Sequence, residues 1–492
     1  MHVPEWVKDA VFYQIFPDRF ARSVELSKPA NLQPWGDPPT AHQFQGGDLL
    51  GIAERLDYLT DLGINALYLC PIFQSAANHR YHTHDYYRVD PILGGNDALH
   101  HLVKKAHERG IRIVLDGVFN HASRGFFQFS DILENGPDSP WIDWFLIDSW
   151  PLAPYDFDKP ANYECWWDLR ELPKLNTDNP EVRRFILDVA EYWITEFEID
   201  GWRLDVPEEI ITPGFWEEFR DRVKGANPDA YIVGEIWYEA AGWVTGDRFD
   251  ALMNYPLTEA ILAYSAGDLV SPILMKERIL RPYPKIDAEA FARRLNHLTH
   301  CYDWEVTQVQ LNILDSHDLP RLDSQARGNL NAIELAVLVQ MTLPGAPCVY
   351  YGDEIGIQGT EDFDSTFNDA NARWAFPWDD HSEWKEGLLD YYKTIISLRH
   401  QHPALRRGQF SLLYAKESCC VYMRSYDQER LLVCLNNADV DAEIEVDISQ
   451  SFQNDAQFSV VFDYQGVDFA AGKGRLKLSL PPRSGFVLAA EG

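Results

Sequence analysis

The stretch Gly201-Trp202-Arg203-Leu204-Asp205 decides the fold class of this chain. It is a short apolar run that ends in an acid, and the same form returns as Tyr231-Ile232-Val233-Gly234-Glu235. Short buried runs of this kind predict strands that are covered on both faces, as in a parallel sheet. With a helical pattern between them, the two runs predict successive strand–helix units with an acid at the end of each strand.

Similar runs alternate with amphipathic stretches along most of the chain. The segments 49–62 and 180–197, for example, carry apolar residues at helical spacing. Eight buried strands with intervening helices predict an α/β fold of the (β/α)8 TIM-barrel type. The runs that predict these strands are 10–15, 66–69, 111–115, 201–204, 231–234, 251–254, 310–314 and 348–351.

Two regions interrupt this alternation. Residues 122–171, between the third strand and the next helix, are rich in Trp, Asp and Pro, and their length predicts an inserted domain. After residue 407 the pattern is strand-like, and residues 442–448 alternate apolar with polar side chains. We therefore expect the barrel at 1–121 and 172–407, the inserted domain at 122–171 and a C-terminal antiparallel β-sandwich domain at 408–492.

The chain is strongly acidic, which limits its partners. It has 43 Lys and Arg against 76 Asp and Glu, a net charge of −33. Nucleic acid and anionic membranes both attract basic surfaces, so we expect neither as a partner. The first residues lack the basic and apolar regions of a signal peptide, and no apolar stretch approaches the roughly 20 residues of a membrane span. The seven cysteines form no CxxC pair. We expect a cytoplasmic protein.

Three acids follow predicted strands. Asp205 and Glu235 end the fourth and fifth strands, and Asp318 follows the seventh in Leu314-Asp315-Ser316-His317-Asp318. A single acid in such a place can simply cap a helix. Barrel enzymes, however, place catalytic residues at the C-terminal ends of their strands. Three acids converging there, with Arg203 and His317 beside them, favour a catalytic cluster.

No cofactor or metal motif competes with this interpretation. The sequence contains no GxGxxG, Walker P-loop, HExxH or GxSxG. Paired carboxylates without such a motif are typical of glycoside hydrolysis, in which one acid protonates the departing oxygen and the other attacks the anomeric carbon or directs water to it. We therefore expect no cofactor and no metal in the reaction.

Four short motifs, in order and each at the end of a predicted strand, give the chain a family resemblance. They are Asp116-Gly117-Val118-Phe119-Asn120-His121, Gly201 to Asp205, Glu235-Ile236-Trp237 and Asp315-Ser316-His317-Asp318. Together they resemble the α-amylase family of retaining glycoside hydrolases, family 13, over essentially the whole length. The resemblance implies that Asp205 is the nucleophile, that Glu235 is the acid/base, and that Asp318 holds hydroxyls of the distorted sugar.

The resemblance also implies a set of substrate-binding residues. In it, a tyrosine stacks on the sugar, two histidines bind its hydroxyls, an Asp/Arg pair in the eighth loop contacts nearby sugars, and an arginine keeps the nucleophile ionised. These residues are Tyr81, His121, Arg203, Trp237, His317, Asp369 and Arg373. Trp237 belongs to the fifth-strand motif.

Within the family, Leu172-Pro173-Lys174-Leu175-Asn176 resembles the M-P-K-L-N segment of the neopullulanase, cyclomaltodextrinase and maltogenic amylase group. Three features depart from that group. The barrel begins within about fifteen residues of the start, where the group usually has a β-sandwich domain, so we expect a more open cleft. The group usually has an Asp at the position of His82, and V-A-N-E where this chain has Val206-Pro207-Glu208-Glu209. Both replacements affect contacts with the sugar on the acceptor side of the cleaved bond. Residues 21–25 replace a calcium loop, so we expect no calcium there.

These features predict a retaining hydrolase of α-1,4 and α-1,6 bonds in maltooligosaccharides and branched glucans, similar to debranching enzymes and neopullulanases. The alternatives are a cyclomaltodextrinase or maltogenic amylase that acts on small substrates, and a glucosyl transferase or isomerase of the same family. A sugar-binding accessory protein is disfavoured because such proteins tend to lose the acids. The sequence leaves both a monomer and a homodimer open.

Overall fold

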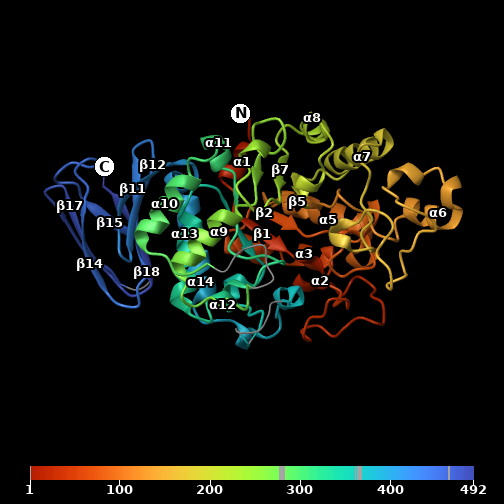
Figure 1. The fold of residues 1–492 in the computed structure, drawn as a ribbon. Helices are drawn as coiled ribbons and strands as arrows, with labels where there is room; N and C mark the ends of the chain where they lie inside the picture. The colour runs from red at the N-terminus through yellow and green to blue at the C-terminus, as the bar shows by residue number, and fades with distance from the viewer. Residues whose placement is uncertain (1, 276–282, 361, 363–367, 464–465, 492) are drawn as a thin grey trace.

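The computed structural model describes residues 2–275, 283–360, 362, 368–463 and 466–491. Within these ranges the centre of the molecule is a barrel of eight parallel strands (Figure 1). Its strands are β1 (Phe12–Ile15), β2 (Ala66–Leu69), β5 (Arg112–Gly117), β6 (Gly201–Leu204), β7 (Tyr231–Gly234), β8 (Ala251–Leu252), β9 (Leu311–Asn312) and β10 (Ala346–Tyr350). They pair in the order β8-β7-β6-β5-β2-β1-β10-β9. A parallel bridge between Met253 and Leu311 joins the two ends and closes the barrel.

The predicted barrel fold is confirmed, and each of the eight predicted runs overlaps one barrel strand. The runs were recognisable because both faces of these strands are covered, and every residue of β6 and β7 is buried. Gly201 shows how close the strands lie, since a Cβ atom there would be 2.2 Å from the carbonyl oxygen of Tyr231. Only glycine therefore fits at the start of the strand that leads to Asp205.

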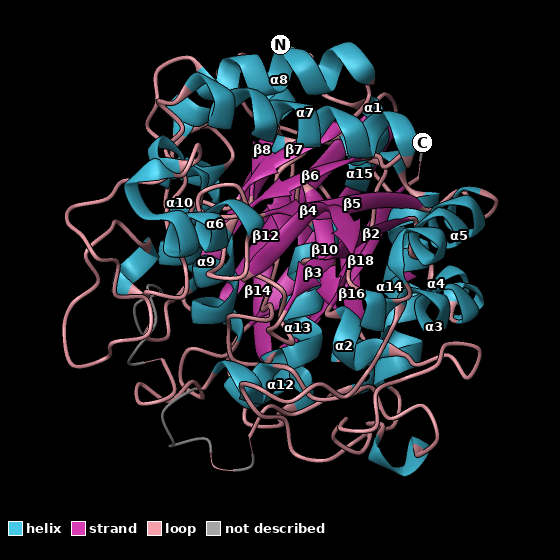
Figure 2. Ribbon diagram, turned by 90° about the vertical axis from the view of Figure 1, so that its right-hand side faces the viewer, coloured by secondary structure: helices cyan, strands magenta, loops and turns pink. Residues whose placement is uncertain are grey.

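Helices surround the strands, as Figure 2 shows. The longer ones are α3 (Leu49–Glu54), α4 (Leu56–Leu62), α5 (Gly95–His107), α7 (Pro180–Glu196), α8 (Phe215–Ala226), α9 (Tyr255–Ser265), α10 (Ala288–Leu298), α13 (Leu330–Thr342) and α14 (Leu388–Gln401). Short helices are α1 (Glu5–Lys8), α2 (Pro17–Phe20), α11 (Trp304–Thr307), α12 (Leu322–Gln325) and α15 (Pro403–Arg407). α7 begins as its sequence predicts, with Pro180 in the first turn and the side chain of Asn179 accepting a hydrogen bond from the Glu181 amide.

The predicted single helix over 49–62 is wrong in one respect. The chain forms two helices, α3 and α4, because the backbone of Arg55 leaves helical geometry at φ −103° and ψ 6°. The Arg55 guanidinium lies 4.2 Å from the centre of the Trp378 ring, so this residue is held by a partner outside the helix. The second helix, α4, ends at Gly63, whose φ of +95° lies in the left-handed region that favours glycine.

Two long connections follow barrel strands. After β2 the chain forms an antiparallel hairpin of β3 (Phe73–Ser75) and β4 (Thr83–Val89), which the sequence did not predict. After β5, residues 122–171 contain α6 (Phe127–Asn135) and irregular backbone. In Figure 1, α6 lies at the opposite end of the molecule from the C-terminal strands.

The C-terminal region consists of two antiparallel sheets. The larger sheet has the order β11-β12-β13-β18-β15 and the smaller β14-β17-β16. Apolar residues of both sheets form a shared core, which confirms the predicted antiparallel region. The strands are β11 (Gln409–Lys416), β12 (Cys419–Tyr426), β13 (Glu429–Asn436), β14 (Ala442–Asp447), β15 (Phe458–Phe462), β16 (Asp468–Gly472), β17 (Arg475–Leu480) and β18 (Ser484–Ala490).

The larger sheet also packs against the barrel helix α13. Residues 332–342 of α13 are all buried, which is expected of a helix covered on both sides. The buried Arg424 of β12 donates a hydrogen bond of 2.5 Å to the carbonyl oxygen of Thr342, at the end of that helix. None of the helices in the described ranges combines the length and the apolar character of a membrane-spanning helix.

Candidate active site

Arg203, on β6, is the centre of a buried group of carboxylates. Its Nη1 donates hydrogen bonds to Asp116 Oδ1 at 2.9 Å and to Asp205 Oδ1 at 3.2 Å. Its Nη2 forms an ion pair of 2.5 Å with Glu235 Oε1. Because β5, β6 and β7 are adjacent parallel strands, their C-terminal ends bring Asp116, Asp205 and Glu235 to one guanidinium. The structure thus brings together two of the three acids that the sequence analysis singled out.

The carboxyl groups of Asp205 and Glu235 are both buried, and both contact Arg203. Burial raises the pKa of Asp205, and the charge of Glu235 raises it further. Burial also raises the pKa of Glu235, against the lowering effect of Arg203. Two like charges that share one cation cannot both form as easily as in water. The pair therefore keeps one proton to a higher pH than separate carboxyl groups would, so one member can act as an acid and the other as a nucleophile.

The third acid, Asp318, lies in a second group of charges. His317 Nε2 is 3.0 Å from Asp318 Oδ2, and Arg373 Nη2 donates a hydrogen bond of 3.1 Å to Asp318 Oδ1. Burial alone would lower the pKa of His317, but the charge of Asp318 outweighs it and raises the pKa to about 10. The same ion pair holds the pKa of Asp318 well below its ordinary value despite burial. Asp318 is therefore ionised at neutral pH, beside an imidazolium.

Tyr81 joins the two groups. It lies in the turn of the β3–β4 hairpin, and its hydroxyl donates to Asp116 Oδ2 at 2.9 Å. The same hydroxyl is 2.6 Å from His317 Nε2, and the two rings are stacked with an interplanar angle of 3°. Asp369 approaches from the eighth loop, with Oδ2 3.7 Å from Arg373 Nη2. Of the ten candidate residues, Tyr81, Arg203, Asp205, Glu235, His317, Asp318, Asp369 and Arg373 therefore form one continuous network.

The remaining two candidates lie at the edges of this network. Trp237 stacks on Tyr255 with ring centres 4.2 Å apart, and the Tyr255 hydroxyl donates to Glu235 Oε1 at 3.2 Å. His121 is buried, its ring packs against Trp166, and its Nε2 has no hydrogen-bond partner. Burial lowers the pKa of His121 to about 3, so the ring is neutral and its free nitrogen can meet a sugar hydroxyl.

Three aromatic residues near the site were missed by the sequence analysis. Tyr255 begins α9, with nothing in its sequence neighbourhood to indicate that it reaches Glu235. Trp166 and Trp167 stack on each other with ring centres 4.6 Å apart, and Trp167 is 64% exposed. Only the high Trp content of residues 122–171 hinted at such a surface. Since flat exposed rings bind sugar faces, the Trp166–Trp167 pair is a candidate subsite beside His121.

The residues that the sequence analysis assigned to the acceptor side have distinctive environments. Val206 has φ +36°, which is a strained conformation for a β-branched residue, directly after Asp205. The Glu208 side chain is largely buried, its Oε2 has no hydrogen-bond partner, and burial raises its pKa to about 7. Glu209 Oε2 lies 3.7 Å from Lys174 Nζ. Burial also lowers the pKa of His82 to about 4, so the residue that replaces the usual Asp is neutral.

The Tyr255→Phe substitution should move the pH dependence of activity. A donated hydrogen bond favours the ionised form of Glu235, so its loss raises the pKa of this carboxyl. If Glu235 is the proton donor, kcat/KM falls as the pH rises through that pKa. We expect the alkaline limb to move up by about one pH unit. Tyr264→Phe is the matched control, because Tyr264 stacks on Phe291 at 4.2 Å and donates to Ser418, away from the site. An alkaline limb that stays in place or moves down contradicts the assignment.

Comparison with known proteins gives a consistent result. The α-amylase catalytic domain family matches residues 14–387, and the α-amylase C-terminal domain family matches residues 408–488. A cyclomaltodextrinase from Geobacillus thermopakistaniensis is 44% identical over 491 residues, which are 99% of this chain and 78% of that protein. A crystal structure of a debranching enzyme from Nostoc punctiforme has a TM-score of 0.88 at 46% identity and covers 99% of both chains. The cyclic α-maltosyl-(1→6)-maltose hydrolase from Arthrobacter globiformis has a TM-score of 0.85 at 37% identity, covering 99% of this chain and all of that chain.

Proposed function

The chain belongs to the α-amylase family of glycoside hydrolases, and from that premise we propose that it cleaves α-1,4 and α-1,6 bonds of maltooligosaccharides and branched glucans with retention of configuration. The observation that carries the proposal is the contact of one buried guanidinium with both Asp205 and Glu235. Two carboxyls held on one guanidinium, of which one keeps its proton to a higher pH, suit the retaining mechanism.

In the first step of the proposed reaction, the Asp205 carboxylate attacks the anomeric carbon and the bond from that carbon to the departing oxygen breaks. Glu235 gives its proton to that oxygen, so the leaving sugar departs neutral. In the second step, the Glu235 carboxylate takes a proton from a water molecule, whose oxygen displaces Asp205 from the anomeric carbon. Two inversions at one carbon give net retention.

The surrounding charges support these roles. Arg203 stabilises the carboxylate form of Asp205 before attack and after release. Asp318 is kept ionised by His317 and Arg373, so a full negative charge faces the sugar when positive charge develops on its ring. His121 offers an unpaired, neutral ring nitrogen to a hydroxyl. We assign Tyr81 and Trp237 to the walls of the site, and Asp369 with Arg373 to its rim.

Two observations favour longer and branched substrates. The Trp166–Trp167 pair provides an aromatic surface beyond the sugar that is cleaved. Among the relatives, the debranching enzyme and the hydrolase of a cyclic 1→6-linked sugar match this chain along nearly their whole length. Contacts with remote sugars raise the rate only if they are realised in the transition state.

The substrate proposal predicts that kcat/KM rises with chain length, and that long or branched maltooligosaccharides exceed maltotriose and cyclodextrin. We would measure kcat/KM across that series and follow fresh product by proton NMR, with the α-anomer expected first. Trp167→Ala should reduce the advantage of long chains by up to about tenfold and leave maltotriose unaffected. A clear preference for cyclodextrin would favour the cyclomaltodextrinase alternative. Formation of longer products when an acceptor sugar is added would favour a transferase.

The proposed chemistry needs only carboxyl groups, so removal of metal ions should leave the hydrolytic rate unchanged. In the segment that replaces the related group's calcium loop, Ser23 Oγ donates to Glu54 and the amide of Ser23 donates to Asp48 Oδ2, which also pairs with Lys28 Nζ at 2.8 Å. A fixed ammonium group beside Asp48 makes this carboxylate a poor cation ligand. We would assay the enzyme before and after EDTA treatment. A loss of activity that calcium restores would contradict this prediction.

We also propose the domain limits 1–121 and 172–407 for the barrel, 122–171 for the inserted domain and 408–492 for the C-terminal domain. The limits of the two matched families, 14–387 and 408–488, support them. A cytoplasmic location is supported by the cysteines, all seven of which are free thiols.

A further inference from the structure

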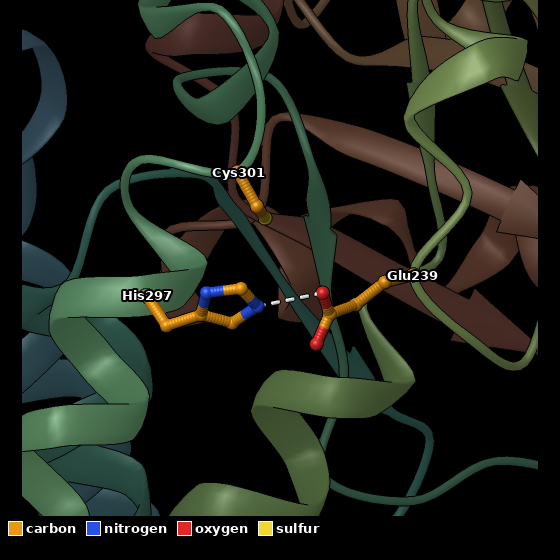
Figure 3. Close-up of side chains that lie close together, drawn as sticks. All are labelled: Glu239, His297 and Cys301. Carbon is orange, nitrogen blue, oxygen red and sulfur yellow. Dashed lines mark hydrogen bonds and ion pairs between the residues drawn. The ribbon is translucent and has the colours of Figure 1, made fainter.

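A cluster of three side chains lies outside the network of acids and has no part in the proposed reaction. It consists of Glu239, His297 and Cys301, which Figure 3 shows facing one another from two different segments. His297 Nε2 is 2.7 Å from Glu239 Oε2. The nearest ligand atoms of all three side chains lie within 4.8 Å of one another.

The backbone holds two of these side chains on one face. His297 lies in the last turn of α10, and the amide of Cys301 donates a hydrogen bond of 2.9 Å to the carbonyl oxygen of His297. This is the i to i+4 bond of an α-helical turn, so the imidazole and the thiol stand one above the other. Glu239 approaches from the loop after β7, four residues beyond Glu235.

The three donors differ in kind, which narrows the choice of ligand. An imidazole nitrogen, a thiol sulfur and a carboxylate oxygen together suit Zn²⁺, which takes all three at about 2.0–2.3 Å. Calcium and magnesium prefer oxygen ligands, so the sulfur and nitrogen disfavour them. A simple ion pair is the alternative explanation for this cluster. It would explain why Glu239 and His297 are close together, but not why the thiol of Cys301 lies beside them.

From this arrangement we propose that Glu239, His297 and Cys301 form a Zn²⁺ site, with water as the fourth ligand. All three side chains are at least partly exposed, so small rotations can bring the donor atoms to the spacing of a tetrahedral ion. The bound ion would tie the end of α10 to the loop that carries Trp237. It would thereby stabilise the wall of the active site without entering the reaction, and the inference does not depend on which glucan is cleaved.

The test uses the full-length chain, stripped of metal with a chelator and then exchanged into chelator-free buffer. Titration with Zn²⁺ alone, followed by calorimetry and by elemental analysis after gel filtration, should give one ion per chain. Loading with Co²⁺ should produce the charge-transfer absorption of a cobalt–thiolate bond. Zn²⁺ should also raise the temperature of unfolding, and the increase should grow with the logarithm of the free Zn²⁺ concentration above Kd.

Variants separate this site from adventitious binding. Cys301→Ser should abolish the cobalt–thiolate band, and both Cys301→Ser and His297→Gln should weaken Zn²⁺ binding by at least about 100-fold. Cys165→Ser is the matched control, because Cys165 is also partly exposed but lies in the inserted segment, and it should change neither measurement. Failure of the wild-type chain to retain Zn²⁺, or a cobalt–thiolate band that persists in Cys301→Ser, would overturn the proposal. Using two variants on different side chains keeps the test valid if one of them folds poorly.

Discussion

Asp205→Asn is expected to lower kcat by at least about three orders of magnitude while the affinity for a maltooligosaccharide stays within a few-fold of the original. The amide is nearly the same size as the carboxylate, so the geometry around Arg203 can persist. An amide cannot form the glycosyl ester, however, and both steps of the proposed reaction are lost. The measurement is the steady-state rate together with calorimetric binding of the same sugar.

Asp369→Asn is the matched control for this substitution. Asp369 lies 3.7 Å from Arg373 Nη2, the nitrogen that also binds Asp318, and has a position at the rim of the site in our proposal. Its replacement should change KM more than kcat. If Asp205→Asn keeps more than a few per cent of the original kcat, in a preparation free of wild-type enzyme, the assignment of the nucleophile is wrong.

Glu235→Gln should also lower the rate on a glucan strongly, by about 10²- to 10⁴-fold, because it removes the proton donor. The loss of rate caused by Glu235→Gln should be smaller for a substrate whose leaving group needs no proton. The loss caused by Asp205→Asn should be large for both kinds of substrate. An α-maltosyl fluoride has a leaving group that needs no proton, so Glu235→Gln should retain much of its rate of glycosyl-enzyme formation on that donor. The measurement compares glucan and fluoride rates for both variants.

The two variants together distinguish the roles of two adjacent acids. With the fluoride donor we expect release of fluoride by Glu235→Gln, and none above the uncatalysed rate by Asp205→Asn. If Asp205→Asn released fluoride and Glu235→Gln did not, Glu235 would be the nucleophile and Asp205 the acid/base. Equal losses on both donors would show that Glu235 acts on the geometry of the group around Arg203 rather than as an acid.

The barrel could be predicted because its strands are covered on both faces. Every residue of β6 is buried, and buried strand positions are mostly occupied by apolar residues. Such a strand is therefore recognisable in the sequence as a short apolar run. The β3–β4 hairpin could not be predicted in the same way. Its strands are only partly buried, and its register shifts at two places, so no regular alternation is present. Tyr81 was found from the family resemblance and not from the structure around it.

The acids of the site could be located for a similar reason, since each follows a buried strand or lies a few residues beyond one. What the sequence could not show is which groups touch. The contact between Tyr255 and Glu235 joins the start of α9 to the end of β7, and the stack of Trp166 on His121 joins the inserted segment to the third strand. The cluster of Glu239, His297 and Cys301 was missed because its members come from two segments and match no single motif.

The closure of the barrel between β8 and β9 bears on how stiff different parts of the site are. Strands β6 and β7 share four paired positions, whereas β7 with β8 and β9 with β10 share two each, and β8 meets β9 at the single bridge of Met253 and Leu311. Few ladder bonds make this the most compliant arc of the described barrel. Glu235 stands on one side of that arc and Asp318 on the other, while Asp205 stands on the firmly paired strand β6. We therefore expect thermal motion of the barrel to change the distance between Glu235 and Asp318 more than the position of Asp205. We therefore expect Asp205, the nucleophile in our proposal, to be held on the more firmly paired part of the barrel, and Asp318 on the less firmly paired part.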